Sequence, residues 1–219
     1  SGTPPVKILK AYFGIDETIF YPPGDTPDTE PRDEIRIIST RNLHPIYGVE
    51  HLIHALLDLQ EQGIFKLVIC GGGPERERLE RLASKLALGH LIEFRGRLGP
   101  GALADEHRAA DVYVSTSRSD STSVSLLEEM ACGVPPVVTD IPANREWITD
   151  GVNGLLVPPG DPASLASALR RLIEGPALAS AARERHLTLV REQGLWKNNM
   201  PTIESAFARL MEVGGRAAP

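Results

Sequence analysis

The chain has 219 residues and a formal net charge of −6 at pH 7, with 42% hydrophobic and 24% charged residues. This composition is typical of a globular domain with an apolar core, and it excludes disordered, collagen-like and coiled-coil chains. The acidic balance argues against nucleic acid or an anionic membrane as the partner, because both bind basic surfaces.

Short runs rich in β-branched residues alternate with helical patterns from Glu34 onward. The predicted strands, in chain order, are Arg36 to Thr40, Phe65 to Cys70, Leu91 to Phe94, Val112 to Ser115, Pro136 to Thr139 and Gly154 to Val157. Apolar residues at three- and four-residue spacing predict amphipathic helices from Val49, from Leu79 and after a capping Asp161. This alternation predicts an α/β fold with a doubly wound parallel sheet that binds ligands at the carboxyl ends of its strands.

The pattern becomes wholly helical after Gly175, with helices predicted over Pro176 to Arg191 and Pro201 to Met211. The chain is therefore divided into an entry segment (1–33), an α/β domain (34–175) and C-terminal helices (176–219).

The cysteines and the apolar runs predict a cytoplasmic protein without a transmembrane helix. Cys70 and Cys132 form no CxxC pair, which predicts reduced thiols in the cytoplasm. The longest unbroken apolar run, Leu67 to Cys70, is far shorter than the roughly 18 residues that cross a bilayer. The first residues, Ser1 to Pro5, do not resemble a secretory signal.

Several catalytic signatures are missing from the sequence. It contains no Walker A lysine motif, no Gly-x-Ser-x-Gly elbow and no HExxH pair, which disfavours P-loop hydrolysis, α/β-hydrolase chemistry and common metal sites. Gly99, Gly101 and Ala104 fit Gly-x-Gly-x-x-Ala, but Pro100 stands between the glycines and no acidic ribose partner follows. Dinucleotide binding is therefore disfavoured too.

Hydroxyl-bearing residues gather between the strand that ends at Ser115 and the helix that follows it. The first amides of a helix lack intrahelical partners and the helix dipole is positive there, so Thr122, Ser123 and Val124 are predicted to donate hydrogen bonds to a phosphate. Ser121 or Thr122 could instead simply cap this helix.

Two acidic residues favour a ligand at this turn. Asp120 stands beside the proposed anion site, where its carboxylate could accept hydrogen bonds from sugar hydroxyls. Glu128 follows between one and two turns into the helix and could reach the ribose of the same nucleotide.

This segment resembles the signature of retaining glycosyltransferases with the GT-B fold. In that signature an acidic residue, here Asp120, is followed after seven residues by a glutamate, here Glu128. Met130-Ala131-Cys132-Gly133 and Pro135 then complete the pattern. This is the large group, glycosyl transferases group 1, that includes glycogen and sucrose synthases and many bacterial glycan-building enzymes. Further matching motifs are Gly14-Ile15-Asp16, Ser39-Thr40-Arg41, Gly71-Gly72-Gly73-Pro74, Phe94-Arg95-Gly96, Asn144-Arg145-Glu146, Asp150-Gly151-Val152-Asn153-Gly154 and Pro158-Pro159-Gly160-Asp161.

The resemblance implies transfer of a hexose from a nucleoside diphosphate sugar, with UDP or GDP as the nucleotide, to an acceptor hydroxyl without a metal or other cofactor. Three side chains would carry the chemistry: Arg41 at the diphosphate, Asp120 at the donor sugar and Glu128 at the ribose. The remaining positions that the resemblance implies in donor binding are Tyr47, Gly72, Arg97, Leu98, Ser121, Thr122, Ser123 and Val124. Arg97 and Leu98 match the place where the base is held, and the turn before the helix matches the phosphates.

The sequence departs from the group's pattern at two of these positions. Asp120 stands where the group usually has glutamate, so its reach is one methylene shorter. Tyr47 stands where the group usually has lysine before Gly48. Because tyrosine carries no charge at neutral pH, Arg41 is left as the main side-chain cation of the predicted site.

GT-B enzymes have two Rossmann-like domains facing each other, and the chain matches one of them, the nucleotide-sugar-binding half. Gly14-Ile15-Asp16 resembles the linker between the halves, so an N-terminal acceptor-binding domain or subunit is the expected partner. The last helix would then expose part of an apolar face that bears Ile203, Phe207, Leu210 and Met211. The alternatives left open are a non-catalytic nucleotide-sugar-binding module and a GT-B nucleotide-sugar epimerase.

Overall fold

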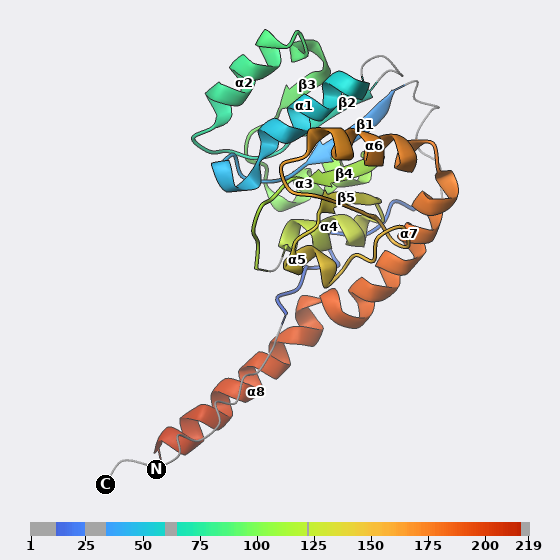
Figure 1. The fold of residues 1–219 in the computed structure, drawn as a ribbon. Helices are drawn as coiled ribbons and strands as arrows, with labels where there is room; N and C mark the ends of the chain where they lie inside the picture. Colours follow the sequence, from blue (N-terminus) through green and yellow to red (C-terminus); the bar gives the residue numbers. More distant parts are fainter. Residues whose placement is uncertain (1–11, 25–33, 60–64, 122, 216–219) are drawn as a thin grey trace, which may run out of the picture.

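The computed structural model describes residues 12–24, 34–59, 65–121 and 123–215 (Figure 1). Six parallel strands form one sheet in the order β3-β2-β1-β4-β5-β6. They are β1 (Ile35–Ser39), β2 (Phe65–Ile69), β3 (Ile92–Phe94), β4 (Val112–Ser115), β5 (Pro136–Thr139) and β6 (Leu155–Val157). The predicted α/β fold with a doubly wound parallel sheet is confirmed, and each strand lies within a residue of its predicted bounds.

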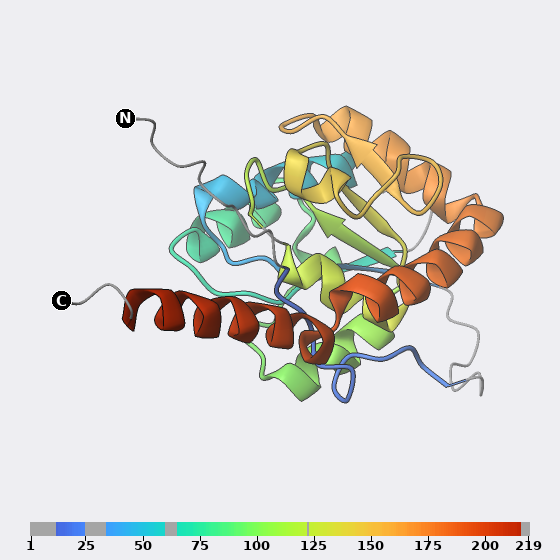
Figure 2. The ribbon, with the colours of Figure 1, turned by 90° about the horizontal axis from the view of Figure 1, so that it is seen from below.

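Helices cover both faces of this sheet (Figure 2). The helices are α1 (Val49–Leu59), α2 (Arg76–Lys85), α3 (Pro100–Arg108), α4 (Val124–Cys132), α5 (Pro142–Arg145), α6 (Pro162–Ile173), α7 (Pro176–Leu189) and α8 (Trp196–Gly215). The apolar side chains of α1, α2 and α6 fill the core on one face. Those of α3 and α4 fill the core on the other.

Successive strand residues alternate between these two cores. Ile37 of β1 belongs to the α1 side and Ile38 to the α4 side. In β4, Val112 and Val114 face the first core and Tyr113 faces the second. A side-chain period of two with both faces buried explains why apolar residues stand at successive positions of these strands.

The strand order reverses between β1 and β4, which pair in parallel at the centre of the sheet. Crossover connections run outward in opposite directions from these two strands, and this leaves a crevice at their carboxyl ends. The loops that follow β1 and β4 therefore meet at the point where a ligand is expected.

The C-terminal helices differ from their predicted bounds. α7 ends at Leu189 and a π-helical turn, η3 (Val190–Gly194), follows it. The predicted start of the last helix at Pro201 is wrong, because α8 begins at Trp196 and contains Pro201. The Leu195 carbonyl accepts the amides of Asn198 and Asn199 and so starts the helix early, although a proline inside it removes one backbone hydrogen bond.

The entry segment packs against the start of α8. The amide of Ile15 donates to the carbonyl of Gly194 (2.8 Å), and the amide of Trp196 donates to the carbonyl of Ile15 (3.0 Å). A Cβ on Gly14 would lie 2.2 Å from the nitrogen of Trp196. Glycine is therefore required where these two backbones touch.

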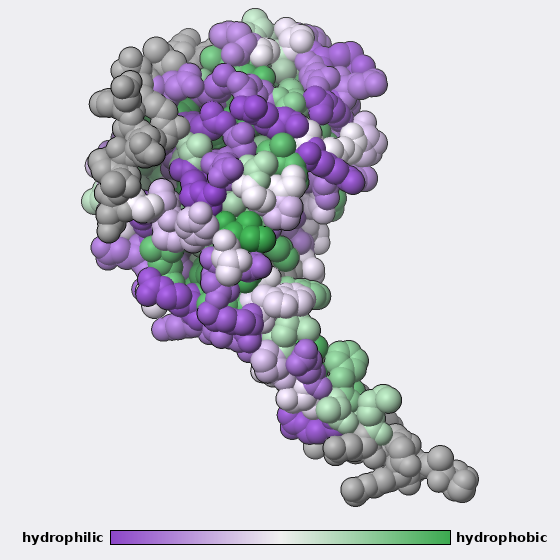
Figure 3. All heavy atoms as spheres, turned by 180° about the vertical axis from the view of Figure 1, so that it is seen from behind, coloured by the Kyte–Doolittle hydropathy of each residue, from purple (hydrophilic) through white to green (hydrophobic). Residues whose placement is uncertain are grey.

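The far part of α8 extends beyond the body of the molecule and carries apolar side chains (Figures 1 and 3). Phe207, Leu210 and Met211 are 65%, 68% and 78% exposed, which confirms the predicted exposure of this face, while Ile203 is half-buried. Within the described ranges, every helix is too short or too polar to span a lipid bilayer.

Candidate functional site

A pocket of about 340 Å³ lies where the loops after β1 and β4 meet. We call it the Arg41 pocket, and its lining residues are Thr40, Arg41, Asn42, Tyr47, Asp120, Val124, Ser125 and Glu128. The structure thus brings together five residues that the sequence singled out, from three parts of the chain: Arg41, Tyr47, Asp120, Val124 and Glu128.

Backbone contacts fix the two loops that form the pocket. A Cβ on Gly71 would lie 2.2 Å from the carbonyl oxygen of Arg41, so the glycine allows the chain leaving β2 to pass directly beside Arg41. The hydroxyl of Thr116 donates to the carbonyl of Tyr47 (2.8 Å). Gly48, at φ +57°, ends the short helix η1 (Pro45–Tyr47) in the left-handed region, which suits glycine.

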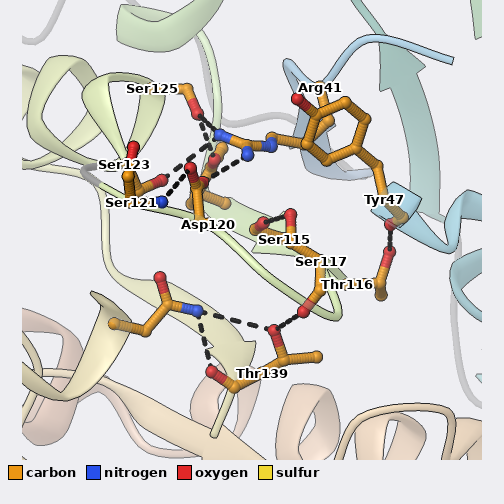
Figure 4. Close-up of polar contacts among 12 residues, drawn as sticks. Arg41, Tyr47, Ser115, Thr116, Ser117, Asp120, Ser121, Ser123, Ser125 and Thr139 are labelled. Atoms are coloured by element: carbon orange, nitrogen blue, oxygen red, sulfur yellow. Dashed lines mark hydrogen bonds and ion pairs between the residues drawn. The ribbon is translucent and has the colours of Figure 1, made fainter. Parts of the chain in front are cut away.

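Arg41 is held by hydrogen bonds and by an aromatic ring (Figure 4). Its Nη1 donates to the hydroxyls of Ser125 (2.6 Å) and Ser123 (3.3 Å), and its Nη2 pairs with Oδ2 of Asp120. The guanidinium carbon lies 4.5 Å from the ring centroid of Tyr47, a distance at which a cation and an aromatic face attract each other. The residue is only 8% exposed, and its Nε has no hydrogen-bond partner in the part of the chain that the structure describes.

A hydroxyl relay supports Arg41 from the core. The phenol of Tyr113 donates to Oγ of Ser125 (3.1 Å), the atom that also accepts from Arg41. Burial raises the pKa of Tyr113 and keeps it a donor. Neither Tyr113 nor Ser125 was singled out by sequence reasoning. Ser125 precedes Glu128 by three residues on α4, and that spacing is the signal that could have found it.

Burial dominates the electrostatics of Glu128. It raises the pKa of this carboxyl to about 7, with the adjacent Glu129 acting in the same direction and His107 and Arg41 opposing it. Near neutral pH the side chain therefore exchanges between its acid and its carboxylate. The carboxylate is the form that accepts two hydrogen bonds from vicinal hydroxyls.

A buried polar pair that the sequence did not indicate lies behind Glu128. His107 of α3 contacts Oε2 of Glu129 through its Nδ1, and both side chains are fully buried. The pair joins α3 to α4 and so fixes the helix that carries Glu128.

Three predicted residues, Gly72, Arg97 and Leu98, are not among the described residues that line the Arg41 pocket. A Cβ on Gly72 would lie 3.2 Å from the Cγ of Arg97, so the arginine stem passes over this glycine. Arg97 itself is exposed, and Leu98 packs half-buried against the core under α3 and α4.

The turn before α4 differs from the expected cap. α4 begins at Val124 with Ser123 at its N-cap, and the Ser123 side chain bonds Arg41 instead of capping the helix. The exposed Ser121 donates its amide to Oδ1 of Asp120 (2.9 Å). Thr122 lies outside the described residues. Val124, at the first turn of the helix, is 37% exposed and lines the pocket. Leu126 is buried.

Comparison with known proteins gives consistent matches. The family described as glycosyl transferases group 1 matches residues 26–186. D-inositol 3-phosphate glycosyltransferase 1 of Catenulispora acidiphila is 28% identical over 236 residues, which cover 100% of this chain and 55% of that protein. Sucrose-phosphate synthase from Thermosynechococcus elongatus has a similar structure, with a TM-score of 0.84 and 26% identity over 92% of this chain and 52% of that one.

A further similar structure is that of Anabaena Alr3699/HepE in complex with UDP-glucose. Its TM-score is 0.79 at 20% identity, and the match covers 91% of this chain and 57% of that one. The chain therefore spans about half the length of the proteins that it matches.

Proposed function

The chain belongs to the glycosyl transferases group 1, and we propose that it is the donor-binding half of a retaining hexosyltransferase. In this role it holds a nucleoside diphosphate sugar while the sugar passes to an acceptor hydroxyl. The observation that carries the proposal is the convergence of Arg41, Asp120 and Glu128 on one pocket at the reversal of strand order. In sheets of this kind, ligands bind at that place.

Each of these side chains has a distinct task in the proposed reaction. Negative charge grows on the departing diphosphate, and the guanidinium of Arg41 and the first free amides of α4 stabilise it. Glu128 accepts hydrogen bonds from the ribose hydroxyls, and Asp120 accepts them from the hydroxyls of the sugar. The partly buried pocket strengthens all of these interactions, because few water molecules screen them.

UDP is the nucleotide that we propose for the donor, and the UDP-glucose complex of the structurally similar Anabaena protein supports this choice. The matched proteins are about twice as long as this chain, which supports an acceptor-binding half outside it. We therefore expect this chain to bind the donor and to require that other half for transfer.

Calorimetric titration of the wild type and of Arg41→Ala with UDP tests the proposal. Loss of one member of a buried charge pair costs about 2–5 kcal/mol of binding, so UDP affinity should fall at least about tenfold. Arg36→Ala is the matched control, because Arg36 lies near the start of β1, pairs with Glu106 (2.5 Å) and is absent from the described lining of the pocket. Equal UDP binding by Arg41→Ala and the wild type would refute the donor site.

Transfer from a radiolabelled UDP-sugar, measured with and without the acceptor-binding half, tests the reaction itself. Product should form only when both halves are present. An isomerised sugar that forms without acceptor would identify an epimerase instead, and donor binding without any reaction in the two-half protein would identify a binding module.

A further inference from the structure

Arg41 is the one cation among the described residues that line the Arg41 pocket, and protein groups already engage it. Both hydroxyls on the Nη1 side, from Ser123 and Ser125, take hydrogen bonds from Arg41, and Asp120 covers its Nη2. Among the pocket's described lining residues, this one arginine faces two carboxyl groups, Asp120 and Glu128. The lining therefore offers a diphosphate no uncommitted positive charge.

Both oxygens of the Asp120 carboxylate are held in this arrangement. Oδ2 pairs with Arg41, and Oδ1 accepts the amide of Ser121 (2.9 Å). The side chain of Asp120 is only 16% exposed, so water screens the pair weakly. A phosphate oxygen that approaches Nη2 of Arg41 must displace this carboxylate or lie against it.

On the basis of the proposed function, we propose that Asp120 is a specificity-determining residue. Its carboxylate competes with the diphosphate for Arg41, and the pocket therefore prefers the intact nucleotide sugar to free UDP. Two chemical differences between these ligands drive the preference. The terminal phosphate of UDP carries nearly one more negative charge at neutral pH, because its last proton dissociates with a pKa of about 6. That phosphate also lacks the hydroxyl donors by which a sugar can compensate Asp120.

The consequence of this preference is easier release of the product. After transfer, the sugar no longer donates hydrogen bonds to Asp120 and the phosphate has gained charge. The carboxylate then returns to Arg41 as UDP leaves.

Calorimetric titration of the folded chain with UDP, UDP-glucose and uridine separates these effects. Asp120→Asn removes the charge and keeps the shape, so it should bind UDP at least about tenfold more tightly than the wild type. The affinity for UDP-glucose should rise less, because the variant no longer offers a charged acceptor to the hydroxyls of the sugar. Uridine should bind the two proteins equally, because it carries no phosphate.

Asp58→Asn is the matched control, since it makes the same change of charge at an exposed position in the last turn of α1, away from the pocket. It should leave all three affinities unchanged. Asp120→Ser provides a second neutral side chain if the asparagine variant does not fold, and thermal unfolding checks both.

Unchanged or weaker UDP binding by the folded neutral variants, while Arg41→Ala still loses UDP, would overturn the competition and leave the donor site intact. An equal rise in affinity for UDP and for UDP-glucose would overturn the role of Asp120 in distinguishing these two ligands. Failure of every variant, the wild type included, to bind UDP would overturn the proposed function and this inference with it.

Discussion

Replacing Glu128 by glutamine should stabilise the fold at alkaline pH and weaken nucleotide binding. Burial raises the pKa of Glu128 from its ordinary value of 4.5 to about 7. The unfolded chain thus ionises this carboxyl at lower pH than the folded chain does. The stability that its acid form contributes is complete below pH 4.5 and is lost as the pH rises through 7.

The size of the effect follows from this shift of about 2.5 pKa units, at 1.36 kcal/mol per unit. Burial of Glu128 costs the wild type about 3 kcal/mol at pH 8, where the folded chain carries the carboxylate, and about 1 kcal/mol at pH 5, where only the unfolded chain is ionised. The neutral amide of Glu128→Gln avoids this cost at both pH values. The stability gain of the variant over the wild type should therefore grow between pH 4.5 and pH 7 and level off above pH 7.

Urea unfolding at pH 5 and pH 8 measures this difference. Glu77→Gln is the control, since the Glu77 side chain is 85% exposed and its removal should change the free energy of unfolding by less than about 0.5 kcal/mol at either pH. A stability gain of Glu128→Gln that does not grow with pH would refute the desolvation of Glu128.

Nucleotide binding should change in the opposite direction. Glu128→Gln exchanges charge-assisted hydrogen bonds to the ribose for neutral ones, which are about half as strong, so UDP affinity should fall about tenfold. The wild type should bind UDP more tightly as the pH rises through 7 and Glu128 ionises. Greater stability with poorer binding is the trade-off expected of a functional site.

Two further predictions concern positions outside the pocket lining. His186 donates from Nε2 to the carbonyl of Asn153 (2.5 Å), and burial lowers its pKa to about 4. Its contribution of about 3 kcal/mol is complete above pH 6.5 and is lost as the pH falls towards 4. In urea unfolding, His186→Gln should lose less stability than the wild type as the pH falls from 6.5 to 4. An equal loss of stability in the two proteins would contradict this. Gly71→Ala should destabilise the fold by about 1–3 kcal/mol and weaken UDP binding in calorimetry, because it displaces the backbone of Arg41. Gly101→Ala, with nothing within 4 Å of its Cβ in α3, should instead stabilise by about 0.5–1 kcal/mol and bind normally. Wild-type binding by Gly71→Ala would refute the role of the close approach.

The sequence determined the features that depend on local spacing. Short apolar runs rich in β-branched residues located the strands of the sheet, and a period near 3.6 located its helices, because burial on fixed faces imposes these patterns. The polar turn after β4 predicted an anion site, and the spacing from Asp120 to Glu128 suggested a donor site through its resemblance to the glycosyltransferase signature. Both depend on a short segment whose geometry is set by its own strand and helix.

Only the tertiary structure decided which of these residues touch. Arg41 and Asp120 are 79 positions apart, and they meet because the crossovers place β4 beside β1 at the centre of the sheet. The same holds for His107 and Glu129, and for Tyr113 beneath Arg41. Spacing along the chain fixes the face on which a side chain lies, but its partner depends on which elements pack against that face. The sequence therefore predicted Arg41 as the main cation of the site, and the fold showed that the carboxylate of Asp120 already pairs with it.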